Sequence, residues 1–308
     1  MESANRKQGF GVSEIDFGML MDLRVDYAFK LFFGTGDTSF LVSLLNAVFK
    51  NKKLPRLVKS LTVVNPFLEK QSESDKQSVL DIRAKLDDDS NALIEMHLYD
   101  ILDLKYKTIR SWARAYGEDI EAGDEYSSQP PVICVAFVDG SVDKGESRKI
   151  HKCCKITDID DCKVFSDALE LHFIDMKAFA KTINETGDIQ QGEAWDSQLG
   201  KWLALIAEKD IEDKSIIKGI CEEEEEMGMA VSALVRLSED KVMRQAYQKR
   251  QDEIMLHRRR DRRISELEAE VLRITDENAR IAAESEEHKA IIAELRSQLE
   301  KTRNSHPV

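Results

Sequence analysis

The sequence predicts an α/β fold, in which a mixed β-sheet is flanked by helices. Three observations lead to this prediction. Apolar residues recur at helical spacing between residues 19 and 50, which indicates two helices divided by the break "GTGD" at 34–37. Residues 78–99 alternate on both sides of the turn "DDDSN", which is typical of a β-hairpin. Residues 130–139, "PPVICVAFVD", form a continuous apolar run, which is typical of a strand buried on both faces.

The remaining elements follow from similar signals. A short β-branched stretch at 61–68 is expected to form a strand that ends at Pro66, and residues 100–123 have helical periodicity and stop at a glycine. Two more strands and two more helices are expected further along, at 149–155, 169–175, 195–210 and 227–252. The order of helix, helix, three strands, helix and buried strand is that of a mixed sheet with flanking helices.

The segment 257–303 has a different character from the rest of the chain. Aromatic residues disappear, and a seven-residue repeat begins at Ile264. Its a and d positions are Ile264, Leu267, Val271, Ile274, Asn278, Ile281, Ser285, His288, Ile292, Leu295, Leu299 and Thr302. This repeat predicts a coiled coil, and an asparagine at an a position favours a parallel homodimer. The alternative is a single charged helix, because Ser285 and His288 weaken the middle of the seam.

Composition and charge restrict the function classes. The 308 residues carry a net charge of −13, so any contact with DNA must be local. Three basic runs are candidates for such a contact or, alternatively, are solvated faces: 50–59, 147–155 and 257–263. No 18-residue apolar run and no signal segment is found, so we expect a cytoplasmic protein without a membrane span and with reduced cysteines. No phosphate-binding loop motif supports a nucleotide cofactor.

The hairpin carries charged side chains on two strands that are otherwise apolar. Asp81 lies in the first strand, and Glu95 and His97 lie in the second, on faces opposite the apolar residues. If the apolar faces pack together, these three side chains share one face. Two carboxylates repel each other unless a cation joins them, and Mg²⁺ binds through one or two carboxylates, water and substrate phosphate. The spacing is also compatible with an ordinary hairpin whose acids form ion pairs across the ladder.

Several segments, taken in order, resemble the Rpn family of recombination-promoting nucleases and transposases, a branch of the PD-(D/E)XK nuclease superfamily. The matching segments are "VDYAFKLFFG" at 25–34, "LLNAVF" at 44–49, "SVLDIRAKLDDDSNALIEMHL" at 78–98, "GDEYSSQPPVICVAFVD" at 123–139, "LELHFIDMKAF" at 169–179 and "LSEDKVMRQAYQKR" at 237–250. The resemblance spans roughly residues 19–260 and implies a restriction-endonuclease-like PD-(D/E)XK core at 19–185, followed by a helical extension at 186–256. The coiled coil at 257–303 lies outside the resemblance, and short tails are expected at 1–18 and 304–308.

The resemblance also implies an activity, that of a metal-dependent DNA endonuclease that cleaves the phosphodiester with a metal-activated water. Asp81 and Glu95 would bind Mg²⁺ or Mn²⁺. His97 departs from the family, which commonly has glutamine there where the superfamily has lysine, and a neutral imidazole can orient or deprotonate the attacking water. The alternative is a decayed nuclease fold that acts as a coiled-coil interaction or DNA-binding protein.

Three accessory residues complete the predicted site. Asp26 and Lys30 match the first-helix motif of the family. Asp26 is a candidate third acidic contact, although an ion pair or a helix cap is the alternative. Arg110, on the helix that follows the hairpin, is a candidate phosphate contact.

Overall fold

The computed structural model describes residues 15–64, 81–98, 103–118, 125–140, 142, 149–189 and 197–304. Within these residues a six-stranded sheet has the order β1-β2-β3-β4-β6-β5. The strands are β1 (Leu61–Val63), β2 (Ile82–Leu86), β3 (Asn91–His97), β4 (Val132–Val138), β5 (His151–Thr157) and β6 (Val164–Asp175). Strands β3, β4 and β6 are parallel, while β2 and β5 pair antiparallel on either side of them. The predicted mixed sheet with flanking helices is confirmed.

The helices of the described residues surround this sheet. They are α1 (Asp26–Gly34), α2 (Ser39–Asn51), α3 (Leu104–Glu118), α4 (Met176–Thr186), α5 (Ser197–Ile206), α6 (Lys214–Glu223), α7 (Glu225–Glu239) and α8 (Lys241–Asn304). Short 3₁₀ turns occur at Phe17–Met19, Tyr126–Ser128 and Glu208–Asp210. The sequence predicted neither α4 nor α6 as a separate element. The predicted helix at 227–252 is divided, because Asp240 accepts hydrogen bonds from the backbone N–H groups of Val242 and Met243 at 2.9 Å and begins a new helix.

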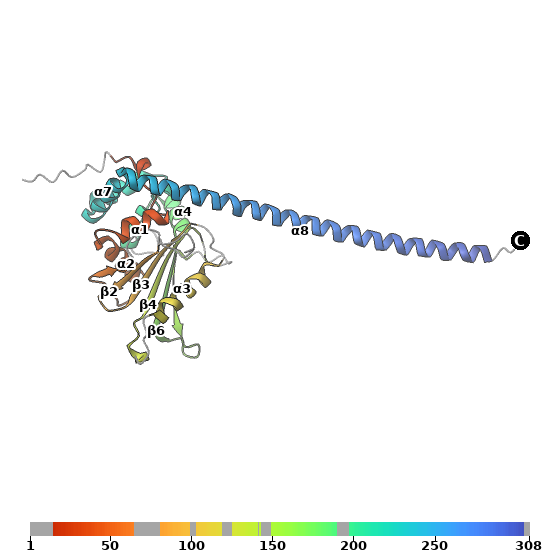
Figure 1. Cartoon of the computed structure of the whole chain (residues 1–308), viewed down its shortest axis with the longest axis horizontal. Coiled ribbons are helices and arrows are strands. Elements are labelled where there is room, and N and C mark those ends of the chain that lie inside the picture. Colours follow the sequence, from red (N-terminus) through yellow and green to blue (C-terminus); the bar gives the residue numbers. More distant parts are fainter. Residues whose placement is uncertain are drawn as a thin grey trace, which may run out of the picture. The chain divides into compact units, whose positions relative to one another are not determined.

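The two faces of the sheet are covered by different helices (Figure 1). On one face Phe29 of α1 lies against Phe137 of β4, with the ring centroids 5.5 Å apart. On the other face α3 contributes Leu104 and Ala115 to a buried cluster that also contains Cys134 of β4. All seven residues of β4 are buried, which explains why this strand is apolar without alternation.

A chain of buried polar groups crosses the α2 side of the sheet near β5 and β6. The side-chain amide nitrogen of Asn51 donates to Nδ1 of His151 at 2.7 Å, so the proton of that ring is on Nε2. This Nε2 lies 2.9 Å from Nδ1 of His172, whose Nε2 in turn lies 2.8 Å from Glu170. The carboxylate of Glu170 is also bound by the ammonium group of Lys155 at 2.9 Å. The polar groups in this chain are therefore paired, as buried polar groups must be.

The chain forms two compact units, which meet between Gln251 and Asp252. The second unit is the continuation of α8, a helix of 64 residues (Figure 1). Its apolar side chains are exposed, including Ile264, Leu267, Val271, Ile274, Ile281, Ile292, Leu295 and Leu299 of the heptad seam. The predicted helix is confirmed, whereas its pairing in a coiled coil stays a prediction.

No single helix of the described residues is long and apolar enough to cross a membrane. The bent pair α1 and α2, with 106° between its members, would pass by length and composition alone. Most of the apolar side chains of these two helices are buried in the core.

Candidate active site

The β2–β3 hairpin brings the two predicted acids next to one pair of residues. Ile82, the first residue of β2, pairs with Ile94 of β3, so Asp81 directly precedes this pair on one strand and Glu95 directly follows it on the other. The turn that fixes this register passes through Asp89, whose φ of 64° lies in the left-handed region that aspartate tolerates. Glu95 lies two residues after Leu93 in β3, so its side chain points to the face that α3 covers.

Glu95 and His97 form a hydrogen-bonded pair at the carboxyl end of β3. Glu95 is only 6% exposed, and its Oε2 lies 2.7 Å from Nε2 of His97, which is half-buried. A carboxylate oxygen accepts, so Nε2 carries the proton and donates it, which leaves the lone pair on Nδ1. Glu95 thus fixes both the orientation and the tautomer of the imidazole.

Lys30 adds a buried positive charge near Asp81. It lies on α1 and is 1% exposed. Burial lowers the pKa of the Lys30 ammonium, and the negative charge of Asp81 opposes this change. The family motif alone brought Lys30 into the predicted site, and the fold now provides a physical reason for its presence there.

Asp26 forms an ion pair with Arg250, near the start of α8. The guanidinium group of Arg250, in the first turns of α8, binds both carboxylate oxygens of Asp26, with Nε 2.8 Å from Oδ1 and 3.1 Å from Oδ2. The pair is reinforced by a further bond from the Arg250 Nη2 atom to Oδ2. Of the two alternatives that the sequence left open for Asp26, the structure shows the ion pair. No sequence signal connects two residues this far apart in the chain.

Arg110 lies on the exposed side of α3. The buried residues of this helix are Leu104, Thr108 and Ala115, which form the stripe that faces the sheet. Position 110 is on the opposite side of the helix from that stripe. Arg110 therefore does not point toward the sheet face that carries Glu95, and a contact with phosphate there requires a substrate that extends around α3.

The donor set suits a divalent cation of the magnesium type. Among the described residues, no three histidine, cysteine, aspartate or glutamate side chains form a preformed metal cluster. Mg²⁺ does not need such a cluster, because it keeps several waters and binds through one or two carboxylates together with substrate phosphate oxygens. Asp81 and Glu95, each next to the paired residues Ile82 and Ile94, can supply these carboxylates.

A mixed sheet with two acids close in the chain to one hairpin is the framework of a nuclease-like α/β fold. A family model described as "PD-(D/E)XK nuclease family transposase" matches residues 23–261. Because this match covers more than half of the chain, the protein belongs to that family, and the predicted resemblance is confirmed. The comparisons with curated proteins and with solved structures gave no match.

Proposed function

We propose that this protein is a metal-dependent endonuclease that hydrolyses phosphodiester bonds of DNA. One observation carries the proposal: His97 is hydrogen-bonded to Glu95 on β3, beside the start of β2, which Asp81 directly precedes. Membership in the nuclease family supports this activity and DNA as the substrate. The net charge of −13 means that attraction to DNA must come from local groups.

Each side chain has a distinct part in the proposed reaction. Asp81 and Glu95 would hold Mg²⁺ or Mn²⁺, which, when bound, polarises the scissile phosphate and lowers the pKa of a water. Oε2 of Glu95 accepts the hydrogen bond from Nε2 of His97, so we assign Oε1 to the ion. Nδ1 of His97 accepts a proton from the attacking water, and Glu95 stabilises the resulting imidazolium. The water oxygen bonds to phosphorus while the phosphorus–oxygen bond to the leaving strand breaks.

Lys30 has an electrostatic part in this proposal. Its buried ammonium offsets the negative charge of Asp81 and would stabilise the negative charge that develops on the phosphate oxygens in the transition state. Asp26 is assigned to anchoring α8 against α1 through Arg250, because its carboxylate is already neutralised there. Arg110 remains a candidate for a backbone contact outside the cleaved bond.

Cleavage of supercoiled plasmid tests the proposal. Wild-type protein with Mg²⁺ or Mn²⁺ is expected to nick or linearise the plasmid, and Asp81→Asn is expected to lose activity by at least about 100-fold. The matched control is Asp89→Asn, which removes the same charge from the turn of the same hairpin, at a left-handed position that asparagine also tolerates. Uncut plasmid with the wild-type protein, or equal rates for the wild type and Asp81→Asn, would contradict the proposal.

The second candidate function is a nuclease fold that has lost catalysis and acts through its C-terminal helix. His97 in place of the family's glutamine and the exposed apolar seam of α8 favour it. We propose that the seam pairs with a second copy of the chain as a parallel coiled coil under either function. Replacement His97→Gln separates the two functions. Cleavage that appears only in His97→Gln identifies a decayed site, whereas a wild type that cleaves and is slowed by His97→Gln identifies an active imidazole.

A further inference from the structure

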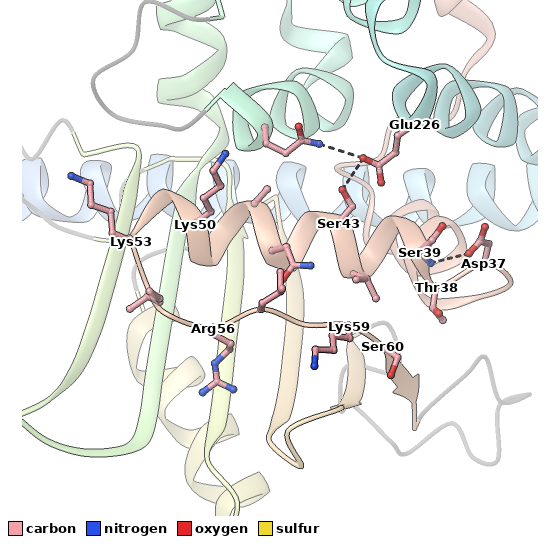
Figure 2. A pocket seen from close by; sticks show the side chains of 16 residues that line it. Asp37, Thr38, Ser39, Ser43, Lys50, Lys53, Arg56, Lys59, Ser60 and Glu226 are labelled. Atoms are coloured by element: carbon pink, nitrogen blue, oxygen red, sulfur yellow. Dashed lines mark hydrogen bonds between the residues drawn. The ribbon is translucent and has the colours of Figure 1, made fainter.

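A groove of about 1000 Å³ runs along α2, on the unit that carries the sheet (Figure 2). One wall is the solvent-facing stripe of α2, where Ser39, Ser43, Asn46 and Lys50 follow one another at intervals of three or four residues. The apolar residues of the helix face the core instead. The other wall is the segment 52–60, which leaves the C-terminus of α2 and turns back beside it.

The segment 52–60 is held in place by specific contacts. The chain reverses at Lys53, which has a φ of 54° and therefore lies in the left-handed region. Further along, the side-chain amide of Asn46 makes two hydrogen bonds with the backbone of Val58, donating to its carbonyl at 2.9 Å and accepting from its N–H at 2.8 Å. These two bonds fix the width of the groove, so the groove is a built feature of the fold.

The walls of the groove carry four cations, Lys50, Lys53, Arg56 and Lys59. The three lysines are exposed, while Arg56 forms an ion pair with Asp88 of the hairpin turn and a 2.7 Å hydrogen bond with Ser90. Positions 53, 56 and 59 follow at intervals of three along one segment, so they span at most about 20 Å.

The acids of the groove lie at its other end. Glu226 accepts from the hydroxyl of Ser43 at 2.9 Å, and Asp37 accepts from the backbone N–H of Ser39 at 2.8 Å (Figure 2). In the basic run at 147–155 Lys155 is bound by Glu170 and Asp167, as Arg56 is bound by Asp88 at the groove. Within a protein of net charge −13, the groove gathers four cations, three of them on exposed lysines.

We propose that this groove binds the phosphate backbone of double-stranded DNA, outside the bond that is cleaved. The cations do not converge on one point: Figure 2 shows Lys50 and Lys53 directed to one side of the segment 52–60 and Arg56 and Lys59 directed to the other. Such a row suits an extended polyanion rather than a small anion. Each strand of duplex DNA presents one charge for about every 3.4 Å of its axis, so a span of at most about 20 Å corresponds to roughly six phosphates of one strand. The hydroxyl groups of Thr38, Ser39 and Ser60 supply further phosphate donors.

The groove and the acids of the candidate active site lie at opposite ends of β2. The backbone N–H of Lys59 donates to Oδ1 of Asp87 at 2.9 Å, and Asp87 follows the last residue of β2, whereas Asp81 precedes the first. Six residues of extended strand separate these two aspartates by about 20 Å, which is the length of about six base pairs. This inference rests on the proposed function for its substrate, but it concerns binding, which does not require catalysis.

Fluorescence anisotropy with a labelled duplex of about 25 base pairs, in EDTA so that no cleavage occurs, tests the inference. The variant is Lys53→Asn with Lys59→Gln, because asparagine tolerates the left-handed position 53. The matched control is Lys177→Gln with Lys181→Gln, which removes the same two charges from exposed positions of α4. The groove variant is expected to reduce the slope of log K against log salt by about 2 and to weaken binding roughly 10- to 60-fold at 0.1 M salt. The control is expected to bind as the wild type does.

The outcomes separate this inference from the proposed function. An unchanged salt slope in the groove variant, or an equal loss in the control, would overturn the inference even if the wild type cleaves plasmid. A lowered slope in the groove variant alone supports it, even if the protein never cleaves. Labelled polyglutamate provides the remaining comparison: if its binding, and not that of the duplex, depends on Lys53 and Lys59, the groove binds an acidic protein segment and the inference is wrong.

Discussion

The buried pair His151 and His172 makes the stability of this fold depend on pH. Each ring nitrogen in the pair already takes part in a hydrogen bond, with one N–H and one lone pair on each ring. An added proton on Nδ1 of His172 would face the N–H of His151, and an added proton on His151 would face the amide hydrogens of Asn51. Burial, together with the positive charges that His172 and Lys52 contribute, lowers the pKa of His151 to about 2. Burial also lowers the pKa of His172, against the opposing effect of Glu170.

The direction of the effect follows from linkage. An unfolded chain binds a proton at each histidine once the pH falls below the ordinary pKa of 6.5, whereas the folded chain keeps His151 neutral down to about 2. The stabilisation is therefore complete above pH 6.5 and is lost as the pH falls from 6.5 toward 2. The loss for His151 amounts to about 1.4 kcal/mol for each pH unit, or about 2 kcal/mol between pH 8 and pH 5. His172 acts in the same direction.

Glu170 extends the same trend to lower pH. Its pKa is lowered to about 2: burial acts to raise it, but the hydrogen bond and charge of His172 and those of Lys155 outweigh that effect. Its contribution is therefore present above the ordinary value of 4.5 and is lost between 4.5 and about 2. Between about pH 5 and 6.5, the contribution of this network to the slope of the unfolding free energy against pH comes from the two histidines alone.

Urea denaturation at several pH values between about 5 and 8 measures the effect. Tryptophan fluorescence reports on the unit that carries the sheet, independently of α8, because none of the three tryptophans lies in α8. The free energy of unfolding should fall steeply below pH 6.5 in the wild type, and the slope should decrease by about 1.4 kcal/mol per pH unit in His151→Gln. His288→Gln, on the exposed part of α8, is the control and should keep the wild-type slope. A flat profile between pH 5 and 7, or an unchanged slope in His151→Gln, would refute the reasoning.

Three other predictions test separate parts of the structure. Lys30→Met should strengthen Mn²⁺ binding in a calorimetric titration, since it removes a positive charge near Asp81, and should slow plasmid cleavage by about 100-fold; weaker binding would contradict this role. Phe33→Ala should lower the free energy of unfolding by about 3–5 kcal/mol in urea, because the ring is 0% exposed, and a loss below about 1 kcal/mol would show that the core refills the space. Ile281→Asp at a d position should convert a dimer to a monomer in light scattering, whereas Ala283→Asp, on the outer side of the repeat, should not.

Local signals in the sequence predicted the centre of the fold well. The run at 130–139 became β4 because a strand buried on both faces has no polar side, and the turn "DDDSN" closed the hairpin of β2 and β3. The break between the first two helices falls at Gly36, whose φ of 80° explains the glycine. These elements share one property: the information that specifies them lies within a few neighbouring residues.

Two elements were missed although their end signals were in the sequence. Helix α4 begins where Asp175 accepts from the backbone N–H of Ala178 at 2.8 Å and ends at Gly187, with a φ of 69°. Helix α6 begins in the same way at Asp213, which accepts from the N–H of Ser215 at 2.9 Å. In each case an aspartate caps the start of the helix. Asp175 is also the last residue of the strand predicted at 169–175, and Asp213 comes shortly after the helix predicted at 195–210.

The candidate site was predictable only in part. Alternation along two strands predicted one face for Asp81, Glu95 and His97; Glu95 and His97 do lie together on β3, whereas Asp81 lies just before β2 and its face stays a prediction. The bond between Glu95 and His97 follows from the same two-residue spacing. The approach of Lys30 to Asp81 and the ion pair of Asp26 with a residue 224 positions away depend on how helices pack, and no local pattern encodes those contacts.

The pairing of β2 with β3 links the position of the candidate acids to the stability of the fold. A slip of β2 by a single residue would exchange the faces of all its side chains and turn Asp81 away from Glu95. The same slip would carry Ile82, Ala84 and Leu86 out of the interior, where each is at most 3% exposed. A shift in register would therefore destabilise the fold and displace the two acids at the same time. Selection for a well-folded chain thus also preserves the relative position of these acids.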